Sequence, residues 1–170
     1  AAAQLHDCGK HINTAAYHKH TWYLIRHGEL LGYSETEHLM VAAIARYHRR
    51  GLPKKRHESW QLIEGREEKR SVASLALLLR LAAALDRRPA MLIERIKLEP
   101  IGPDNAPTGF RIVLHPCAVG PGQEPLDLSL ECWSLRSCSD AVREATGLTL
   151  EVASDAELRG APEMSASAPR

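Results

Sequence analysis

The sequence predicts an α+β fold in which a mainly α-helical domain is followed by a small mixed α/β domain. Apolar residues recur at helical spacing up to about residue 88. From about residue 91 they alternate with polar residues, as in half-buried strands. The charge changes at the same place, because residues 1–98 hold 17 Lys and Arg against 10 Asp and Glu, and residues 99–170 hold 5 against 11. An anionic partner would therefore prefer the first part of the chain.

The first domain is expected to span residues 1–90 and to be almost entirely helical. Residues 1–8 resemble a helix end, with Gly9 as a left-handed stop. A short helix is expected at residues 18–27, closed by Gly28. Ser34 and Glu37 form a capping box that opens the next helix, which ends near Gly51 and Pro53.

The rest of this domain contains a polar, basic segment and a long apolar helix. A helical turn is expected around Trp60–Ile63. Residues 71–88 are apolar on nearly all sides, which predicts the buried central helix of the domain. Pro89 ends it.

The second domain is expected to span residues 91–153. Two strands, at residues 93–100 and 109–116, flank a segment rich in turn residues. The remaining expected elements are a short strand near 126–130, a helix over 131–146 and a last strand at 148–152. Residues 154–170 are rich in Ala, Ser, Pro and Glu and are predicted to be a disordered tail.

Composition places the protein among cytoplasmic proteins. Its hydrophobic content of 44% includes no apolar run of the roughly 20 residues that a membrane span requires, and residues 1–10 do not resemble a signal peptide. Its four cysteines, Cys8, Cys117, Cys132 and Cys138, form no CxxC pair and are expected to be reduced thiols. Since the chain lacks an initiator Met, we expect it to be cut from a larger protein.

A first group of candidate functional residues is centred on His6-Asp7 in the run HDCGK. Imidazole and carboxylate side chains from several helices can hold a divalent metal. Asp86 shares a helical stripe with Leu75 and Leu79, so it is expected to be buried, where a charge needs a cation, an ion pair or a proton. The tentative metal ligands are His6, Asp7, His48 and Asp86. Alternatively, His6 and Asp7 only hydrogen-bond each other and the end of their helix.

A second group of candidates is a dense basic cluster at the end of the helix that Ser34 opens. Arginine offers forked donors that match phosphate oxygens. His18 and His20 point nearly opposite ways on a helix, and His20 shares a side with Leu24, which favours His20 as the inward one. The candidate polyphosphate-binding residues are His18, His20, Arg46, Arg49, Arg50, Lys54 and Lys55. Because cations are favoured at helix C-termini, a solvated helix end is the alternative.

Taken together, four stretches resemble the exopolyphosphatase and guanosine pentaphosphate phosphohydrolase (Ppx/GppA) family. They are LHDCGKHINTAAYHKHTWYLI, ELLGYSETE, IARYHRRGLPK and LLLRLAAALDR. The resemblance is strong over residues 1–90 and loose over 91–153. It implies that the first domain is an N-terminally truncated HD-type helical domain.

The resemblance also implies a function. Members of this family begin with two actin-like domains that hold the catalytic carboxylate and release terminal phosphate with magnesium. Nothing in residues 1–170 resembles those domains, so no catalytic residue is expected in this fragment, which is expected to be inactive alone. It is expected to be an accessory, polyphosphate-binding part of the phosphatase. Its expected partners are polyphosphate or guanosine pentaphosphate, the missing actin-like domains and a second copy in a homodimer, but neither nucleic acid nor a membrane.

The sequence departs from the family pattern at one candidate ligand. Relatives read LADALD where this chain has residues 81–86, so the usual HD-type aspartate falls at Ala83. Any metal site of this fragment is therefore expected to lack ligands and to be partial. Its imidazole and carboxylate groups would suit iron, manganese or zinc. Two other functions also stay open, an autonomous metal-dependent HD phosphohydrolase acting on a nucleotide or phosphodiester and a non-catalytic dimerisation or regulatory module.

Overall fold

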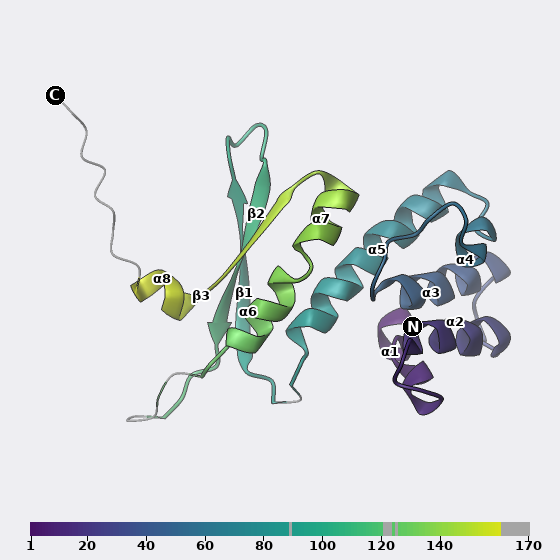
Figure 1. The fold of residues 1–170 in the computed structure, drawn as a ribbon, viewed down its shortest axis with the longest axis horizontal. Helices are drawn as coiled ribbons and strands as arrows, with labels where there is room; N and C mark the ends of the chain where they lie inside the picture. The colour runs from purple at the N-terminus through teal and green to yellow at the C-terminus, as the bar shows by residue number, and fades with distance from the viewer. Residues whose placement is uncertain (89, 121–123, 125, 161–170) are drawn as a thin grey trace. The chain divides into compact units, whose positions relative to one another are not determined.

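The computed structural model describes residues 1–88, 90–120, 124 and 126–160, which form the predicted α+β fold (Figure 1). Every strand in this described part lies between Ile93 and Ser154, and the residues before it are helical or irregular. The chain divides into two compact units. Unit 1 comprises residues 1–84 and 140–147, and unit 2 comprises residues 85–139 and 148–170.

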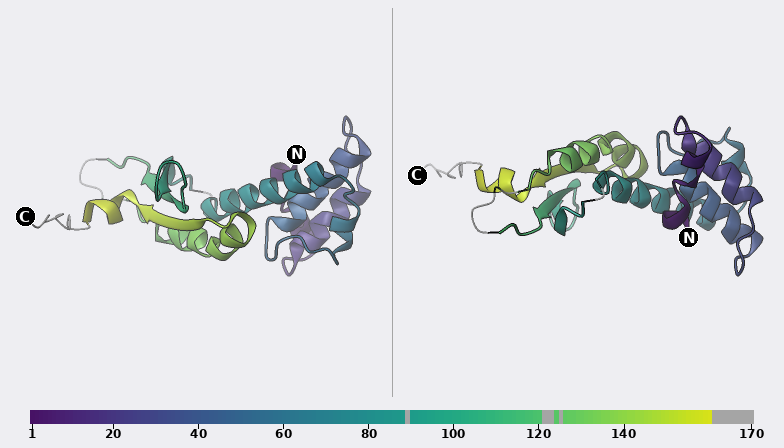
Figure 2. Two further views of the ribbon diagram at one scale, coloured as in Figure 1. Left: turned by 90° about the horizontal axis from the view of Figure 1, so that it is seen from above. Right: turned by 90° about the horizontal axis from the view of Figure 1, so that it is seen from below.

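Unit 1 is a set of helices in which α2 and α3 lie side by side (Figures 1 and 2). The predicted helix at 18–27 is confirmed as α2. Trp60–Ile63, the expected helical turn, overlaps the short helix α4. The elements of this unit are α1 (Ala2–Leu5), η1 (Cys8–His11, a 3₁₀ turn), α2 (Tyr17–His27), α3 (Glu35–Tyr47), α4 (Glu58–Gln61), nearly all of α5 (Arg66–Leu85) and most of α7 (Ser139–Thr146).

The central helix of unit 1 is α3. It begins with the predicted capping box, in which the Ser34 hydroxyl accepts from the Glu37 N–H and the Glu37 carboxylate accepts from the Ser34 N–H. One side of α3 packs in a cluster with Ile25 of α2, and another packs in a cluster with Val72 and Ala76 of α5. The helix is therefore buried on two sides.

The prediction that residues 71–88 form a helix is confirmed in part, but the prediction that this helix is buried on nearly all sides is wrong. Helix α5 does form there, but Leu75 and Leu78 are 45% and 59% exposed. Asp86 is also exposed, beyond the last residue of α5, so its expected burial is wrong as well. An unbroken Ala/Leu run shows no polar face, and burial follows from which side packs against α3 and α4.

Gly9 does not act as the predicted left-handed stop. It is not among the glycines with positive φ, and its importance lies in close packing between η1 and α2. A Cβ atom on Gly9 would lie 2.3 Å from the Tyr17 carbonyl oxygen and 2.4 Å from the Thr21 nitrogen. The Gly9 N–H donates to Thr21 Oγ1 at 3.0 Å, and Thr21 is fully buried. Only glycine allows η1 to approach α2 this closely.

Unit 2 is built on a three-stranded sheet in the order β1-β2-β3. Its strands are β1 (Ile93–Ile101), β2 (Gly109–Pro116) and β3 (Thr149–Ser154), and its helices include α6 (Ser129–Arg136) and α8 (Asp155–Gly160). Strands β1 and β2 pair antiparallel and β2 and β3 pair parallel. The predictions of strands at 93–100, 109–116 and 148–152 are confirmed, the last shifted by a residue or two.

Other predictions for this part of the chain are wrong. No strand forms at 126–130, because α6 begins at Ser129. The helix predicted over 131–146 is two helices, since α6 ends at Arg136 and α7 begins at Ser139. Residues 155–160 of the predicted disordered tail form helix α8, while residues 161–170 of that tail lie outside the described residues.

The two faces of the sheet differ in chemistry. Ile112 and Leu114 of β2 are buried on the face that they share with their cross-strand partners Leu98 and Ile96. The opposite face carries a row of ion pairs in which Arg111 of β2 contacts Glu99 of β1 and Glu151 of β3. The Glu99 carboxylate also binds the Lys97 ammonium at 2.9 Å.

None of the four cysteines forms a disulfide. In the described residues, no helix is both long and apolar enough to cross a membrane.

Candidate functional site

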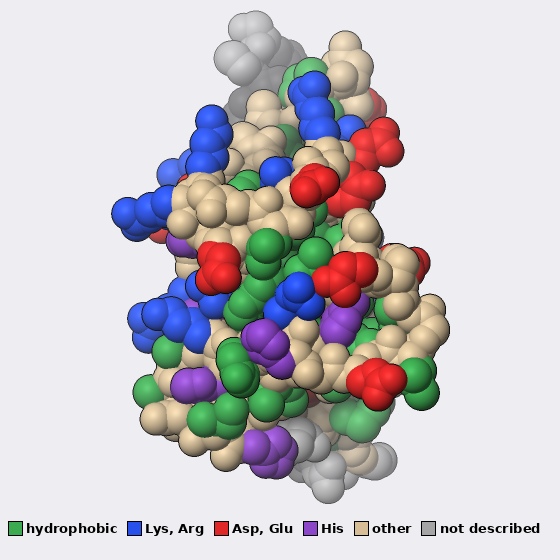
Figure 3. Space-filling view, turned by 90° about the vertical axis from the view of Figure 1, so that its right-hand side faces the viewer, with side chains coloured by type: hydrophobic (Ala, Val, Ile, Leu, Met, Phe, Trp, Pro, Cys, Tyr) green, Lys and Arg blue, Asp and Glu red, His purple; other side chains and the backbone are tan. Residues whose placement is uncertain are grey.

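The candidate site is a cavity of about 220 Å³ in unit 1, at the C-terminal end of α3. Five of its nine lining residues are Lys or Arg, and none is Asp or Glu. The space-filling view shows Lys and Arg side chains gathered along one edge of the face, with histidines among hydrophobic side chains beside them (Figure 3). The lining residues are His18, Lys19, Arg46, Tyr47, Arg49, Gly51, Lys54, Arg56 and His57.

The structure brings together four of the seven candidate polyphosphate-binding residues. His18, Arg46, Arg49 and Lys54 line the cavity, whereas His20, Arg50 and Lys55 do not. Sequence reasoning placed Arg56 in the basic cluster but not among the candidate ligands. It missed the flanking cation Lys19 and the imidazole of His57.

His18 is the inward histidine of α2, so the prediction that His20 points inward is wrong. The buried positions of α2 are His18, Thr21 and Ile25, while His20 is half-buried. The Thr21 hydroxyl accepts a hydrogen bond from the Gly9 N–H, and this contact fixes which side of α2 faces inward. His18 is 7% exposed, and its Nδ1 atom has no hydrogen-bond partner among the described residues. Burial, with the nearby Arg46, Arg49 and Arg50, lowers the pKa of His18 to about 4.

A second buried histidine, His48, supports one wall of the cavity. Its Nδ1 lies 2.6 Å from the Ala45 carbonyl oxygen, an acceptor, so Nδ1 carries the proton. Burial lowers the pKa of His48 to about 4, so the ring is neutral and Nε2 is an acceptor. The Tyr17 hydroxyl, 3.1 Å away, therefore donates to Nε2. The Arg49 guanidinium lies over the Tyr17 ring, 4.6 Å from its centre, in a cation–π contact.

The polypeptide at the end of α3 is held by Arg80 of α5. The Arg80 guanidinium donates to the carbonyl oxygens of Tyr47 and His48 at 3.1 Å, and also to that of Arg50. Arg50 adopts a left-handed φ of 66°, immediately before Gly51. An arginine from a distant helix thus satisfies the free carbonyls at this helix end. Sequence reasoning had no local signal for this contact.

Tyr47 and His57 also line the cavity and are held together by hydrogen bonds. The Lys54 backbone N–H donates to His57 Nδ1 at 3.3 Å. The Tyr47 hydroxyl lies 3.1 Å from the same nitrogen and 2.8 Å from the Ser59 hydroxyl. Burial raises the pKa of Tyr47. These bonds fix the loop that carries Lys54 and Arg56.

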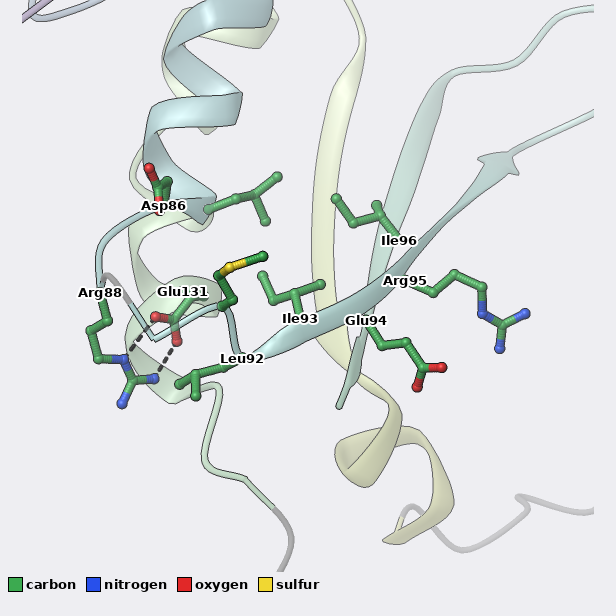
Figure 4. A pocket seen from close by; sticks show the side chains of 10 residues that line it. Asp86, Arg88, Leu92, Ile93, Glu94, Arg95, Ile96 and Glu131 are labelled. Atoms are coloured by element: carbon green, nitrogen blue, oxygen red, sulfur yellow. Dashed lines mark hydrogen bonds and ion pairs between the residues drawn. The ribbon is translucent and has the colours of Figure 1, made fainter. Parts of the chain in front are cut away.

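The residues of the tentative metal site are placed differently. The rings of His6 and His48 meet edge to face with centres 5.0 Å apart, but both His48 nitrogens already have hydrogen-bond partners. The Asp7 carboxylate binds the Lys10 ammonium at 3.0 Å, and this bond lowers the pKa of Asp7. Asp86 belongs to unit 2, where it lines a separate cavity (Figure 4). Among the described residues, no three His, Cys, Asp or Glu side chains are placed to hold a metal ion, so the described residues do not fit the expected divalent metal.

Comparison with known proteins identifies the family. Residues 1–106 match the family model described as Ppx/GppA phosphatase, domain III. A curated relative, guanosine-5'-triphosphate,3'-diphosphate pyrophosphatase of Pseudoalteromonas translucida (strain TAC 125), is 43% identical over 54 residues. That match covers 32% of this chain and 11% of the relative, so the chain matches only about a tenth of that protein's length. Since the family model spans more than half of its residues, the chain belongs to the Ppx/GppA phosphatase family, as the resemblance predicted.

Proposed function

We propose that this chain is an accessory, phosphate-polymer-binding part of a phosphohydrolase, and that it holds a polyphosphate chain in the cavity at the end of α3. The observation that carries the proposal is the composition of that cavity, with five Lys or Arg side chains and no carboxylate. Hydrolysis of the terminal phosphate then belongs to parts of the whole protein outside these 170 residues.

The chemistry of the cavity suits an anion such as phosphate better than a neutral sugar. Arg46 and Arg49 both line it, and guanidinium groups bind phosphate oxygens through two parallel hydrogen bonds. The contacts of Arg49 with Tyr17 and of Arg46 with Tyr47 orient the two guanidinium groups without neutralising them. Neither arginine has an acidic partner within ion-pair distance among the described residues.

The pKa of His18 should respond to a bound ligand. Its imidazole is kept neutral by burial and by surrounding cations. A bound polyanion would offset that positive field, because an opposite charge nearby favours the protonated form. We therefore expect ligand binding to raise the pKa of His18. A solvated helix end predicts no such change.

The proposal is tested with fluorescein-labelled inorganic polyphosphate and the 170-residue chain, by fluorescence anisotropy over a series of salt concentrations. Replacing both pocket arginines, Arg46→Ala with Arg49→Ala, should lower the affinity at least about tenfold. By analogy with nucleic acids, it should also reduce the salt slope by about 0.7–0.9 for each phosphate group that the variant no longer binds.

A matched control removes two exposed arginines elsewhere in unit 1. Arg66→Ala with Arg70→Ala changes the net charge equally, on the first turns of α5, outside the cavity. This control should bind nearly as well as the parent. Equal losses of affinity in both double variants would leave only a general charge effect and would reject the site. Competition with guanosine pentaphosphate then tells which of the two ligands the cavity prefers.

The hydrolytic role is tested separately. The purified chain should release no phosphate from long-chain polyphosphate with magnesium. Turnover that Asp7→Ala abolishes would instead favour the autonomous metal-dependent hydrolase. That function would need Asp7 to leave Lys10 and His48 to leave Tyr17.

A further inference from the structure

The basic cavity of unit 1 lies at the end of a helix that ordinarily repels anions. The peptide dipoles of a helix leave about half a positive charge at its N-terminus and about half a negative charge at its C-terminus. Phosphate is therefore commonly bound at helix N-termini, where free N–H groups point at it. Here the lining residues Arg46, Tyr47, Arg49 and Gly51 belong to the last turn of α3 and the residues that follow it. A phosphate in this cavity requires the negative helix end to be neutralised.

Arg80 of α5 provides the neutralising charge. Its guanidinium donates to the carbonyl oxygens of Tyr47 and His48, each 3.1 Å away, and also to that of Arg50. A fourth carbonyl, that of Ala45, accepts from Nδ1 of His48 at 2.6 Å. A guanidinium keeps a full positive charge in proteins, whereas the helix end carries only about half a negative charge. The helix end and Arg80 together are therefore net positive, by about half a charge.

Arg80 acts from outside the cavity. It is partly buried on α5, and it is not one of the nine residues that line the cavity. Its side chain reaches the main chain at the end of α3, and the lining residues Arg49 and Gly51 lie in the same stretch of chain. Any influence of Arg80 on a ligand therefore passes through that main chain and through its own electric field.

The contacts of Arg80 also leave the cations of the cavity unused by the helix end. Among the described residues, no Lys or Arg side chain that lines the cavity donates to the carbonyls of Ala45, Tyr47, His48 or Arg50. A solvated helix end predicts the opposite, because basic side chains in the last turn then bind the last carbonyls themselves. The division of labour between α3 and α5 thus favours a ligand as the partner of the lining cations.

We propose that Arg80 is a positioning residue for phosphate binding in this cavity, where it reverses the charge of the helix end and leaves the lining cations to the ligand. This inference rests on the proposed phosphate-binding function and adds to it a residue that does not touch the ligand. The charge of the Arg80 guanidinium is the essential property. Its hydrogen bonds alone would hold the main chain in place but would not change the sign of the potential at the helix end.

The test separates the charge of residue 80 from its hydrogen bonds. Arg80→Lys keeps the charge, and Arg80→Gln keeps N–H donors without the charge. Arg70→Gln is the matched control, since it removes the same charge from an exposed position on the same helix, outside the cavity. The affinity of the whole 170-residue chain for fluorescein-labelled inorganic polyphosphate is measured by fluorescence anisotropy at one low salt concentration. Urea unfolding checks that each variant is folded.

Arg80→Gln should raise the dissociation constant about tenfold or more, because a full charge next to the cavity is lost. Arg80→Lys should stay within about threefold of the parent, and so should Arg70→Gln. This rescue by lysine is the result that a purely structural role does not produce, because an ammonium lacks the planar fork that bridges several carbonyls.

Three results would overturn the proposal. Equal losses of affinity in Arg80→Lys and Arg80→Gln would leave Arg80 as a structural contact only. Arg80→Gln binding as well as Arg70→Gln would show that its charge has no special effect on the cavity. If Arg80→Gln does not fold, Arg80→Lys decides alone, and a tenfold loss in that variant rejects the charge role. The phosphate site itself fails separately, when the double variant of Arg46 and Arg49 binds as well as its own control.

Discussion

Replacing Gly9 by alanine should destabilise unit 1 more than any other single methyl group added to a glycine of this unit. The added Cβ would lie 2.3 Å from the Tyr17 carbonyl oxygen, 2.4 Å from the Thr21 nitrogen and 2.7 Å from Thr21 Oγ1. Two of these neighbours are backbone atoms of α2, which cannot rotate away. The turn η1 must therefore shift away from α2 by about 0.7 Å or more to relieve the clash.

The magnitude follows from two contributions. Overpacking of a tight contact costs about 1–3 kcal/mol. The shift also stretches the hydrogen bond from the Gly9 N–H to Thr21 Oγ1, and a buried donor left without its partner costs about 1–3 kcal/mol. We expect a decrease of about 2–5 kcal/mol in the free energy of unfolding, a large share of the about 5–15 kcal/mol typical of a domain.

The assay is urea unfolding followed by tryptophan fluorescence, with exposed Trp133 replaced by Phe, so that Trp22 and Trp60 report on unit 1. Gly51→Ala is the matched control, since an added Cβ there meets nothing within 4 Å and its φ is not positive. The control should stay within about 0.5 kcal/mol of the parent, or stabilise slightly. A Gly9→Ala variant as stable as Gly51→Ala would refute the packing argument.

Three further predictions concern buried polar groups. Thr21→Val should lower the free energy of unfolding by about 1–3 kcal/mol in the same assay, because it leaves the buried Gly9 N–H without an acceptor. Thr21→Ser keeps the oxygen and should lower it less. The folded state holds His18 and His48 neutral, because their pKa values lie near 4, below the ordinary 6.5. The free energy of unfolding should therefore be constant above about pH 7.5 and should fall as the pH drops from 6.5 to 4, by on the order of 3 kcal/mol per histidine. A profile that is flat over that range would contradict this prediction. The hydrogen bond from Arg88 lowers the pKa of the buried Glu131 carboxyl, so this ion pair should stabilise unit 2 above pH 4.5 and lose its effect as the pH falls below that value. Acid unfolding can be followed by near-ultraviolet circular dichroism, and Glu131→Gln should reduce the loss of stability below pH 4.5.

The parts of the fold that were predicted correctly depend on neighbours in sequence. The Ser34–Glu37 capping box joins residues three apart, and the strands at 93–101 and 109–116 are set by alternation along one segment. The burial of α5 was not predictable in this way, because its Ala/Leu sequence permits any side to face inward. Its packed side is chosen by α3, a separate helix.

The candidate site shows the same division. The basic residues Arg46, Arg49 and Lys54 were found because they cluster in sequence. The choice of His18 over His20 was missed, because it depends on Thr21 accepting a hydrogen bond from Gly9, twelve residues away. Arg80, 30 or more residues from the carbonyls that it binds, left no trace in any local pattern.

The HDCGK run is connected to the basic cavity through the neutral side chain of His48. His6 packs edge-on against His48, and His48 accepts the Tyr17 hydroxyl, whose ring carries the Arg49 guanidinium. If His48 were protonated, both ring nitrogens would be donors, and the Tyr17 hydroxyl would have to accept from Nε2 instead of donating to it. A neutral, buried imidazole is also what a metal ligand must be. The same chemical demand on this histidine therefore holds whether it ligates an ion or orients the residues of the proposed phosphate site.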